Sequence, residues 1–289
     1  MSISEVIEPY VVAKGPILLR RFLPSPKRQM VGPFIFLDQA GPTQIRVTSQ
    51  SGCSEHPHSG TATLTYLLNG NLTHRDSAGG YAELSSGDLA LMTAGSGITH
   101  EEKPQGDSIG TLRDLYFIEA WLALPDDLEN SEPSFEHHKH RSLPEVCFES
   151  GSAWVLVGEG WGETAPTTSY TRTVLADISI EPGGLLPLEL DYEEIAIFLM
   201  QGDASLNEAP LQVCAMSVYR SVGVPVLKSK SGCRALVLGG DSFSSPRFIE
   251  QNFVASSKVL LESQASKYRN GEFPSLLSEY YAQIQNLRN

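Results

Sequence analysis

Residues 56–70 read HPHSGTATLTYLLNG. The second half of this stretch is rich in β-branched, aromatic and aliphatic residues, and it stops at Asn69-Gly70, a strong two-residue hairpin signal. His56 and His58 lie two positions apart, so on an extended strand both imidazoles point to the same face of a sheet. The stretch therefore predicts a strand with two neighbouring imidazoles, followed by a strand that turns back through a hairpin.

His100 and Glu102 repeat the same spacing farther along the chain. Two short strands that meet inside a barrel could present these three imidazoles and one carboxylate to a single point. Such a donor set suits Fe, Mn, Ni, Cu or Zn, and it leaves open positions on a metal that prefers six neighbours. The alternative is a set of unrelated polar residues on a barrel wall, but burying uncompensated imidazoles beside a carboxylate would cost stability. We therefore predict that His56, His58, His100 and Glu102 bind one metal ion.

Short β-rich segments recur between turn signals throughout the chain. Residues 89–92 follow the turn Ser86-Gly87-Asp88, and residues 195–200 end at Gln201-Gly202 much as the first hairpin strand ends at Asn69-Gly70. The content of 25 Gly and 18 Pro in 289 residues indicates many tight turns and few long helices. We predict an all-β chain that holds two similar barrels in tandem.

The segment from Pro125 to Pro144 is polar and charged and has no sustained apolar period, which indicates a linker. Residues 257–268 and 275–287 are expected to be helices, and the second has an apolar stripe that follows Ser275 as N-cap. The expected division is a metal-binding barrel at 1–130, a linker at 131–150, a barrel without a metal site at 151–256, and helices packing on the barrels at 257–289.

All seven histidines lie at or before His140, so the second barrel cannot repeat the ligand set of the first. His74 sits just beyond the hairpin and is expected to face solvent or to be hydrogen-bonded. His137, His138 and His140 form a cluster, but we interpret it as part of the linker, where nothing rigid would hold coordination geometry.

The formal net charge of −13 argues against a nucleic-acid or anionic-membrane surface, because both need clustered positive charge. Glu5 and Glu8 precede any apolar stretch, unlike the basic start of a secretory signal, and the longest apolar run, residues 195–200, is too short to span a bilayer. We expect a cytoplasmic protein with no membrane and no direct nucleic-acid partner. The four cysteines form no C-x-x-C pair and are expected to be free thiols, and Cys53, near His56, is interpreted as a small buried hydrophobe.

The motifs around these residues are similar, in content and in order, to those of the pirin family of the cupin superfamily. The similar segments are His56-Pro57-His58, residues 65–70, 74–77, 87–89 and 92–98, His100 with Glu102, and, outside this dense block, residues 33–38, 121–125 and 257–273. The resemblance implies a bicupin fold, in which two double-stranded β-helix (jelly-roll) barrels follow each other. It also implies one mononuclear divalent metal ion, usually iron, with Ni, Mn, Cu or Zn as alternatives. Carried over by position, its ligands are His56, His58, His100 and Glu102.

The chain departs from the usual pirin pattern close to the expected site. Ser59-Gly60-Thr61-Ala62 stand where pirins usually have Arg-Gly-Phe-Glu, Glu119 stands where they tend to carry an uncharged residue, and residues 250–252 differ from the usual Gly-Pro-containing run. These changes leave the ligand set intact. They alter its surroundings, which control substrate fit and the electronic properties of the metal.

The resemblance leaves the function open, because pirins include quercetin 2,3-dioxygenases and a nuclear transcription cofactor that depends on iron. As a metal-dependent dioxygenase, the protein would act on O₂ and a small aromatic or enolic substrate such as a flavonol, with Glu102 as the general base. As a non-catalytic redox or metal sensor, it would bind a protein partner. A third hypothesis is a structural cupin whose ion only holds the barrel together. The basic residues that offer either a docking surface or an ordinary solvated strand are Lys14, Arg20, Arg21, Lys27 and Arg28.

Overall fold

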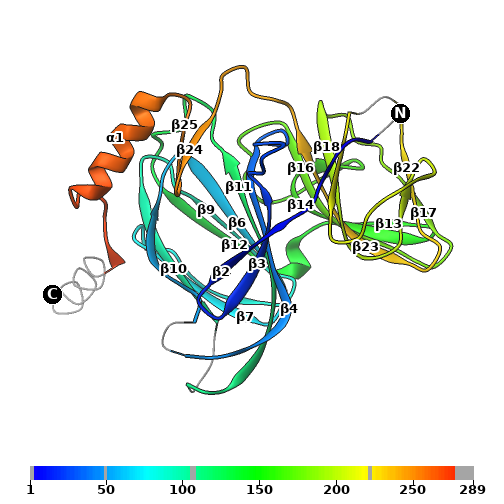
Figure 1. Ribbon diagram of the computed structural model, residues 1–289, viewed down its shortest axis with the longest axis horizontal. Coiled ribbons are helices and arrows are strands. Elements are labelled where there is room, and N and C mark those ends of the chain that lie inside the picture. Colours follow the sequence, from blue (N-terminus) through cyan, green and yellow to red (C-terminus); the bar gives the residue numbers. More distant parts are fainter. Residues whose placement is uncertain (1–2, 49–50, 105–108, 221–222, 277–289) are drawn as a thin grey trace. The chain divides into compact units, whose positions relative to one another are not determined.

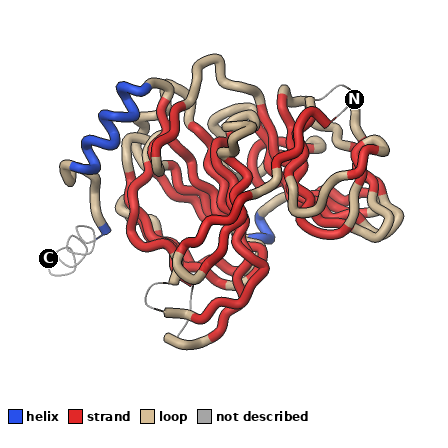
Figure 2. The backbone as a smooth tube through the Cα atoms, in the orientation of Figure 1, coloured by secondary structure: helices blue, strands red, loops and turns tan. Residues whose placement is uncertain are grey.

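The computed structural model describes residues 3–48, 51–104, 109–220 and 223–276. Strands make up most of this part of the chain (Figures 1 and 2). The described residues form two compact units, which we call the first and the second barrel. The first barrel contains residues 11–20, 38–140 and those from 244 onward, and the second contains residues up to 10, 21–37 and 141–243. The predicted all-β architecture with two barrels is confirmed.

The first barrel is built mainly from two sheets with the strand orders β12–β9–β6–β11–β4–β3–β2 and β5–β10–β7–β8. Residues 21–23 of β3 and 34–37 of β4 are grouped with the second barrel. In the same order, the strands of the larger sheet are Ser134–His138, Leu89–Thr93, Thr61–Asn69, Leu112–Ala123, Phe34–Arg46, Ile17–Leu23 and Tyr10–Lys14. Those of the smaller sheet are Cys53–His58, Ile98–Pro104, Asn71–Asp76 and Tyr81–Ser85.

The hairpin predicted at Asn69-Gly70 is wrong, because β6 and β7 do not pair with each other. β6 pairs with β9 and β11, whereas β7 pairs with β8 and β10 in the other sheet, so the chain passes from one sheet to the other at Gly70. This glycine has a φ of 109°, and a Cβ at this position would lie 2.4 Å from the carbonyl oxygen of Asp114, so only glycine fits. Near Gly70, Leu67 of β6 belongs to the apolar core of the first barrel. Because side chains alternate along a strand, residues two, four and six positions earlier share this inward face. They are Thr65, Thr63 and Thr61. The interior is therefore apolar at one end of β6 and polar at the other.

The second barrel also has two sheets, with the orders β1–β21–β18–β23–β16–β14–β13, where β15 pairs with β14, and β17–β22–β19–β20. In the same order, the larger sheet contains Ile3–Ile7, Met216–Tyr219, Glu194–Gly202, Cys233–Gly240, Thr173–Ile180, Gly151–Gly160 and Glu145–Phe148, with β15 at Glu163–Thr164. The smaller sheet contains Leu185–Pro187, Val226–Lys228, Ser205–Leu206 and Ala209–Pro210.

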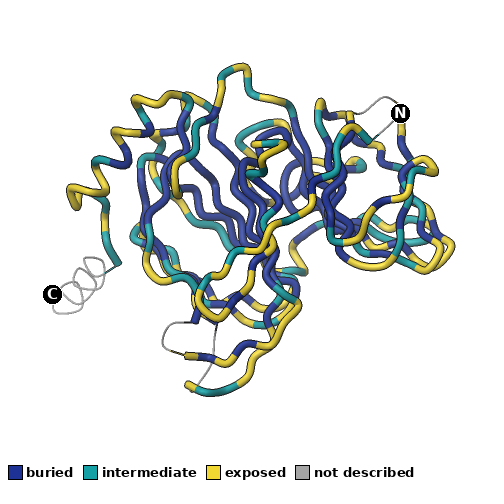
Figure 3. The backbone as a smooth tube through the Cα atoms, in the orientation of Figure 1, coloured by how far each residue is buried: buried dark blue, intermediate teal, exposed yellow. Residues whose placement is uncertain are grey.

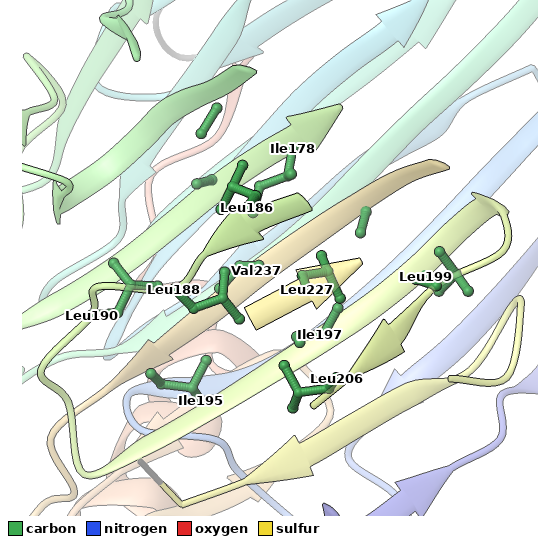
Figure 4. Packing of buried hydrophobic residues seen from close by; sticks show 14 of the residues in the cluster. Ile178, Leu186, Leu188, Leu190, Ile195, Ile197, Leu199, Leu206, Leu227 and Val237 are labelled. Carbon is green, nitrogen blue, oxygen red and sulfur yellow. The ribbon is translucent and has the colours of Figure 1, made fainter. Parts of the chain in front are cut away.

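Aliphatic side chains fill the interior of the second barrel (Figure 4). They come from both of its sheets, and removing this apolar surface from water is the main force that holds the sheets together. Those labelled in the figure are Ile178, Leu186, Leu188, Leu190, Ile195, Ile197, Leu199, Leu206, Leu227 and Val237. This interior packs as a hydrophobic core, in contrast to the polar end of the first barrel.

The grouping of residues differs from the segments expected from the sequence. β1 pairs with β21 of the second barrel, whereas β24 (Phe248–Glu250), β25 (Phe253–Ala255) and α1 (Lys258–Arg269) belong to the first. The expected linker contains β12 of the first barrel, a short 3₁₀ helix at His140–Ser142, and β13 of the second. Pairing with a free sheet edge satisfies main-chain hydrogen bonds, and a local sequence pattern does not identify the partner.

Helix α1 forms where the first C-terminal helix is predicted. Ser257 is its N-cap and accepts a hydrogen bond from the backbone N–H of Leu260. The second predicted helix, residues 275–287, lies almost wholly outside the described residues. Buried residues concentrate on the strands of each barrel (Figure 3). In the described part of the chain, no helix has the length and apolar character needed to cross a membrane.

Candidate metal centre

Two neighbouring antiparallel strands of the first barrel, β5 and β10, carry the predicted ligands. His56 lies directly opposite His100, and His58 lies opposite Ile98. One ring nitrogen from each of His56, His58 and His100 lies within 4.8 Å of the other two. The Nε2 atoms of His56 and His100 are 3.0 Å apart. The three imidazoles therefore converge on one point, as the spacing of residues along each strand predicts.

Glu102 joins this cluster through His100. Its carboxylate forms a second close group with His100 and His74, again with ligand atoms within 4.8 Å of one another. A register shift between His100 and Glu102, with the extra residue on β5, places Glu102 opposite Cys53. Thr65 Oγ1 on β6 donates a hydrogen bond of 2.9 Å to Oε1 of Glu102. The structure thus brings all four predicted residues into two groups that share His100.

Burial holds the imidazoles in their neutral form. It lowers the pKa of His58 and of His100 far below the usual value. Burial also lowers the pKa of His56, and the positive charge of Lys14 adds to the effect. His56 Nδ1 lies 2.7 Å from the carbonyl oxygen of Ser54. Because a carbonyl oxygen only accepts, Nδ1 carries the proton, and Nε2 directs its lone pair toward His100.

The chemistry of this donor set fits a metal ion. Both ring nitrogens of His58 and Nδ1 of His100 are buried and have no hydrogen-bond partner among the described residues. A buried polar group without a partner is costly, and a bound cation would use one of these lone pairs. Neutral imidazoles together with a carboxylate are donors that divalent first-row metals accept. The prediction of a cluster suited to a metal ion is confirmed.

The sequence analysis missed the contact between His74 and Glu102. His74 is buried on β7, with Nε2 3.1 Å from Oδ2 of Asp76 and Nδ1 3.5 Å from Oε1 of Glu102. Phe135 stacks on its ring at a centroid distance of 4.2 Å. Burial acts to lower the pKa of His74, but the two carboxylates outweigh it and raise this pKa above the usual value. The expected hydrogen bond is present, and the solvent-facing alternative is wrong. The i, i+2 spacing of His74 and Asp76 was the available signal.

The pKa of Glu102 is lowered by its neighbours. Burial acts to raise it, but hydrogen bonding and charge from His74, the hydroxyl of Thr65 and the charge of Lys14 outweigh burial. The carboxylate is therefore ionised at neutral pH. Its Oε1 atom faces Thr65 and His74, which leaves Oε2 as the oxygen available to a ligand.

Strands β6 and β11 line the interior beside this cluster. Glu119 lies opposite Thr65, and Trp121 lies opposite Thr63. Trp121 Nε1 donates a hydrogen bond of 3.0 Å to Oε1 of Glu119. The Trp121 ring meets His58 edge-on at a centroid distance of 4.8 Å. Within the described residues, the hydroxyl of Thr63 is buried without a hydrogen-bond partner. The cluster is therefore bounded by an aromatic ring, a second carboxylate and threonine hydroxyls.

Comparison with known proteins identifies the family. The sequence profile described as Pirin matches residues 17–122, and that of the Pirin C-terminal cupin domain matches residues 175–274. A pirin-like protein of Caulobacter vibrioides is 35% identical over 260 residues, which cover 87% of this chain and 88% of the relative. The chain belongs to the pirin family. Its two barrels are accordingly the two cupin domains of a bicupin.

Solved structures support the same fold for this pirin family member. A quercetin 2,3-dioxygenase from Acinetobacter baumannii superposes with a TM-score of 0.84 at 30% identity, covering 92% of this chain and 88% of that chain. The bacterial pirin YhhW of Escherichia coli, solved in complex with nickel(II), superposes with a TM-score of 0.66 at 15% identity, covering 83% and 99%. The likeness to YhhW concerns the fold alone.

The unusual segment at residues 59–62 is shaped by contacts with β25. A Cβ at Gly60, whose φ is 68°, would lie 1.9 Å from the carbonyl oxygen of Val254. The backbone N–H of Val254 in turn donates to the carbonyl oxygen of Ser59 at 3.1 Å. Thr61, at the place where pirins usually have Phe, is buried, and its hydroxyl has no hydrogen-bond partner among the described residues. A small polar side chain thus replaces a large aromatic one.

Lys14 is the second residue that the sequence analysis did not connect with the site. It is half-buried on β2, within hydrogen-bonding reach of the Cys53 thiol. Burial acts to lower the pKa of Lys14, but Glu119, then Cys53 and Glu102, outweigh it and raise this pKa above the usual value. Burial raises the pKa of Cys53 to about 12, so this residue remains a neutral thiol.

The other basic residues that we considered for a docking surface have their own partners. Arg28 of the second barrel pairs with Glu5 at 2.7 Å and with Glu194 at 2.9 Å. Lys27 Nζ donates to the carbonyl oxygen of Val6 at 3.1 Å. The binding of a protein partner stays a prediction.

The remaining histidine cluster lies partly on a strand. His137 and His138 belong to β12, which pairs with β9, so the description of this segment as a linker without rigid structure is wrong. His137 Nε2 lies 3.1 Å from Oδ2 of Asp88, and His138 Nε2 lies 2.9 Å from Oε2 of Glu136. Their side chains therefore pair with carboxylates, and neither belongs to the close groups of ligand atoms found among the described residues.

Proposed function

We propose that this protein is an oxidoreductase of the quercetin 2,3-dioxygenase type, with one mononuclear divalent metal ion held by His56, His58, His100 and Glu102. The observation that carries the proposal is the convergence of three neutral imidazoles beside an ionised carboxylate. The likeness to a quercetin 2,3-dioxygenase at 30% identity supports it. Iron is the first candidate, and Ni, Mn, Cu and Zn suit the same donors.

The residues of the chain would prepare an enolic substrate for reaction. When bound, the ion supplies Lewis acidity and a template for the two reactants. Glu102 would shift between ligand and general base. As base, its Oε2 accepts the proton of the substrate hydroxyl, because Oε1 faces Thr65 and His74. His74, held by Asp76, keeps the carboxylate oriented. Trp121, edge-on against His58, provides an apolar surface for the ring of the substrate.

The experiment compares aerobic and anaerobic incubation with quercetin. Protein loaded with Fe, Mn, Ni or Cu is assayed by loss of the flavonol absorbance, and its metal content is measured by elemental analysis. We expect loss of absorbance that requires oxygen with at least one metal. Absence of this loss with every metal would contradict the proposed activity.

Glu102→Gln tests the role of the carboxylate. The variant should keep much of the metal but lose roughly 10²–10⁴-fold in turnover, the usual contribution of a general base. Glu101→Gln is the matched control, because Glu101 pairs with Lys103 at 2.6 Å and alternation directs it to the opposite face. Full activity of Glu102→Gln would remove the assigned role.

A further inference from the structure

Lys14 and Glu119 are two charged residues of the first barrel that the proposed ligand set does not use. Lys14 lies on β2 two positions after Val12, whose side chain packs against the apolar core, so both point inward. The ammonium of Lys14 reaches the thiol of Cys53. Cys53 lies directly opposite Glu102 in the pairing of β5 with β10. A positive charge therefore lies beside the Glu102 end of the cluster.

Glu119 brings a second carboxylate to the same region. Only 4% of its surface is exposed, and it lies opposite Thr65, the residue that donates to Glu102. The Trp121 indole holds one of its oxygens. Of the charged groups around Lys14, Glu119 exerts the largest effect on it. A positive and a negative charge therefore lie together in the interior of this barrel.

The charge of Lys14 also reaches the histidine side of the cluster. Burial lowers the pKa of His56 most, and the charge of Lys14 lowers it further. For His58 and His100 the neighbouring imidazoles have a larger effect on the pKa than Lys14 has. A bound divalent ion and Lys14 would both present positive charge to a substrate oxygen, and Glu119 would offset part of the charge of Lys14. Charge that is screened from water is costly unless it is compensated. The site therefore favours a substrate whose oxygen gains negative charge as its proton passes to Glu102.

We propose that Lys14 recognises the substrate oxygen that becomes anionic and that Glu119 moderates the strength of this recognition, so that the site selects enols and phenols that bind with this oxygen deprotonated. This inference rests on the proposed function. It adds Lys14 to the metal ion as a second positive group that holds the substrate oxygen.

The test uses 4-nitrocatechol, whose visible absorbance reports the charge state of its oxygens and their binding to a metal. It is titrated anaerobically into the full-length protein loaded with nickel(II). Lys14→Met should weaken binding roughly tenfold, the scale of one charge several ångströms away in a partly buried site. Lys14→Arg should restore it. Glu119→Gln keeps an oxygen for the Trp121 hydrogen bond and removes the negative charge, so it should tighten binding by a similar factor.

Opposite effects of Lys14→Met and Glu119→Gln on the affinity for 4-nitrocatechol distinguish recognition of charge from a structural role, because loss of a structural role would weaken binding in both variants. Lys267→Met in the last turn of α1 removes the same charge from an exposed position and should leave the affinity unchanged. Elemental analysis should find at least as much nickel in Lys14→Met as in the wild type. Equal affinity of wild type and Lys14→Met, or weaker binding in both charge variants, would overturn this inference without affecting the proposed function. Failure of nickel-loaded wild type to bind 4-nitrocatechol would instead contradict the proposed function and remove the inference with it.

Discussion

Replacement of His58 by Leu should separate the stability of the first barrel from its capacity to bind a metal. The His58 imidazole is fully buried, and neither ring nitrogen has a hydrogen-bond partner among the described residues. Leu has a similar volume and no polar atom. Since a buried polar group without a partner costs about 1–3 kcal/mol, metal-free His58→Leu should be more stable than metal-free wild type by roughly this amount.

With metal present, wild type should be more stable than His58→Leu. A ligand that binds only the folded state adds about 2.7 kcal/mol at a concentration one hundred times its Kd. Wild type should gain this stabilisation from nickel(II), whereas His58→Leu should gain little. Thermal unfolding in chelator and in excess nickel(II) measures both effects. His138→Leu is the matched control, because it removes an imidazole of the same barrel that pairs with Glu136; its response to nickel should equal that of wild type.

Two results would refute this reasoning. If His58→Leu is less stable than wild type in chelator, the imidazole is a satisfied structural group. If His58→Leu keeps the full stabilisation by nickel, His58 is not a donor to the ion. Either result would contradict the role of His58 in the proposed ligand set.

Gly60→Ala should destabilise the first barrel by at least about 1–2 kcal/mol, the cost of a left-handed backbone, because its Cβ would also meet a carbonyl oxygen of β25 at 1.9 Å; an unchanged midpoint in urea would contradict this. Asp76→Asn should weaken metal binding about 10–100-fold, because Asp76 orients His74; calorimetric titration with zinc measures the loss, and wild-type affinity would exclude this role. Burial acts to raise the pKa of Asp88, but backbone N–H groups and Lys139 outweigh it and lower this pKa. The ionised form therefore stabilises the fold above the ordinary Asp pKa of about 4, and this contribution is lost as the pH falls through the lowered value. Asp88→Asn should be less stable than wild type at neutral pH, and the two should converge in acid; a stability difference independent of pH would argue against the linkage.

The ligand candidates could be predicted because strand geometry is a local property. Side chains alternate along any extended segment, so His56 had to share a face with His58, and His100 with Glu102. Gly70 likewise marks the end of β6, since the bend there needs a positive φ that other residues adopt at a cost. That the next strand joins the other sheet could not be predicted locally. The periodic recurrence of such segments was enough to predict two barrels, and the absence of histidine after residue 140 assigned the cluster to the first.

Only the tertiary structure decided which residues meet across strands. Lys14 on β2 and Glu119 on β11 come together with Glu102 on β10, although they are far apart in the sequence. In the same way, β1 pairs with β21 of the second barrel, more than two hundred residues away. The reason is that main-chain hydrogen bonds are the same for every strand and do not specify which strand is the partner. The partner and the register are selected by how the buried side chains of a whole barrel pack, which no single segment specifies.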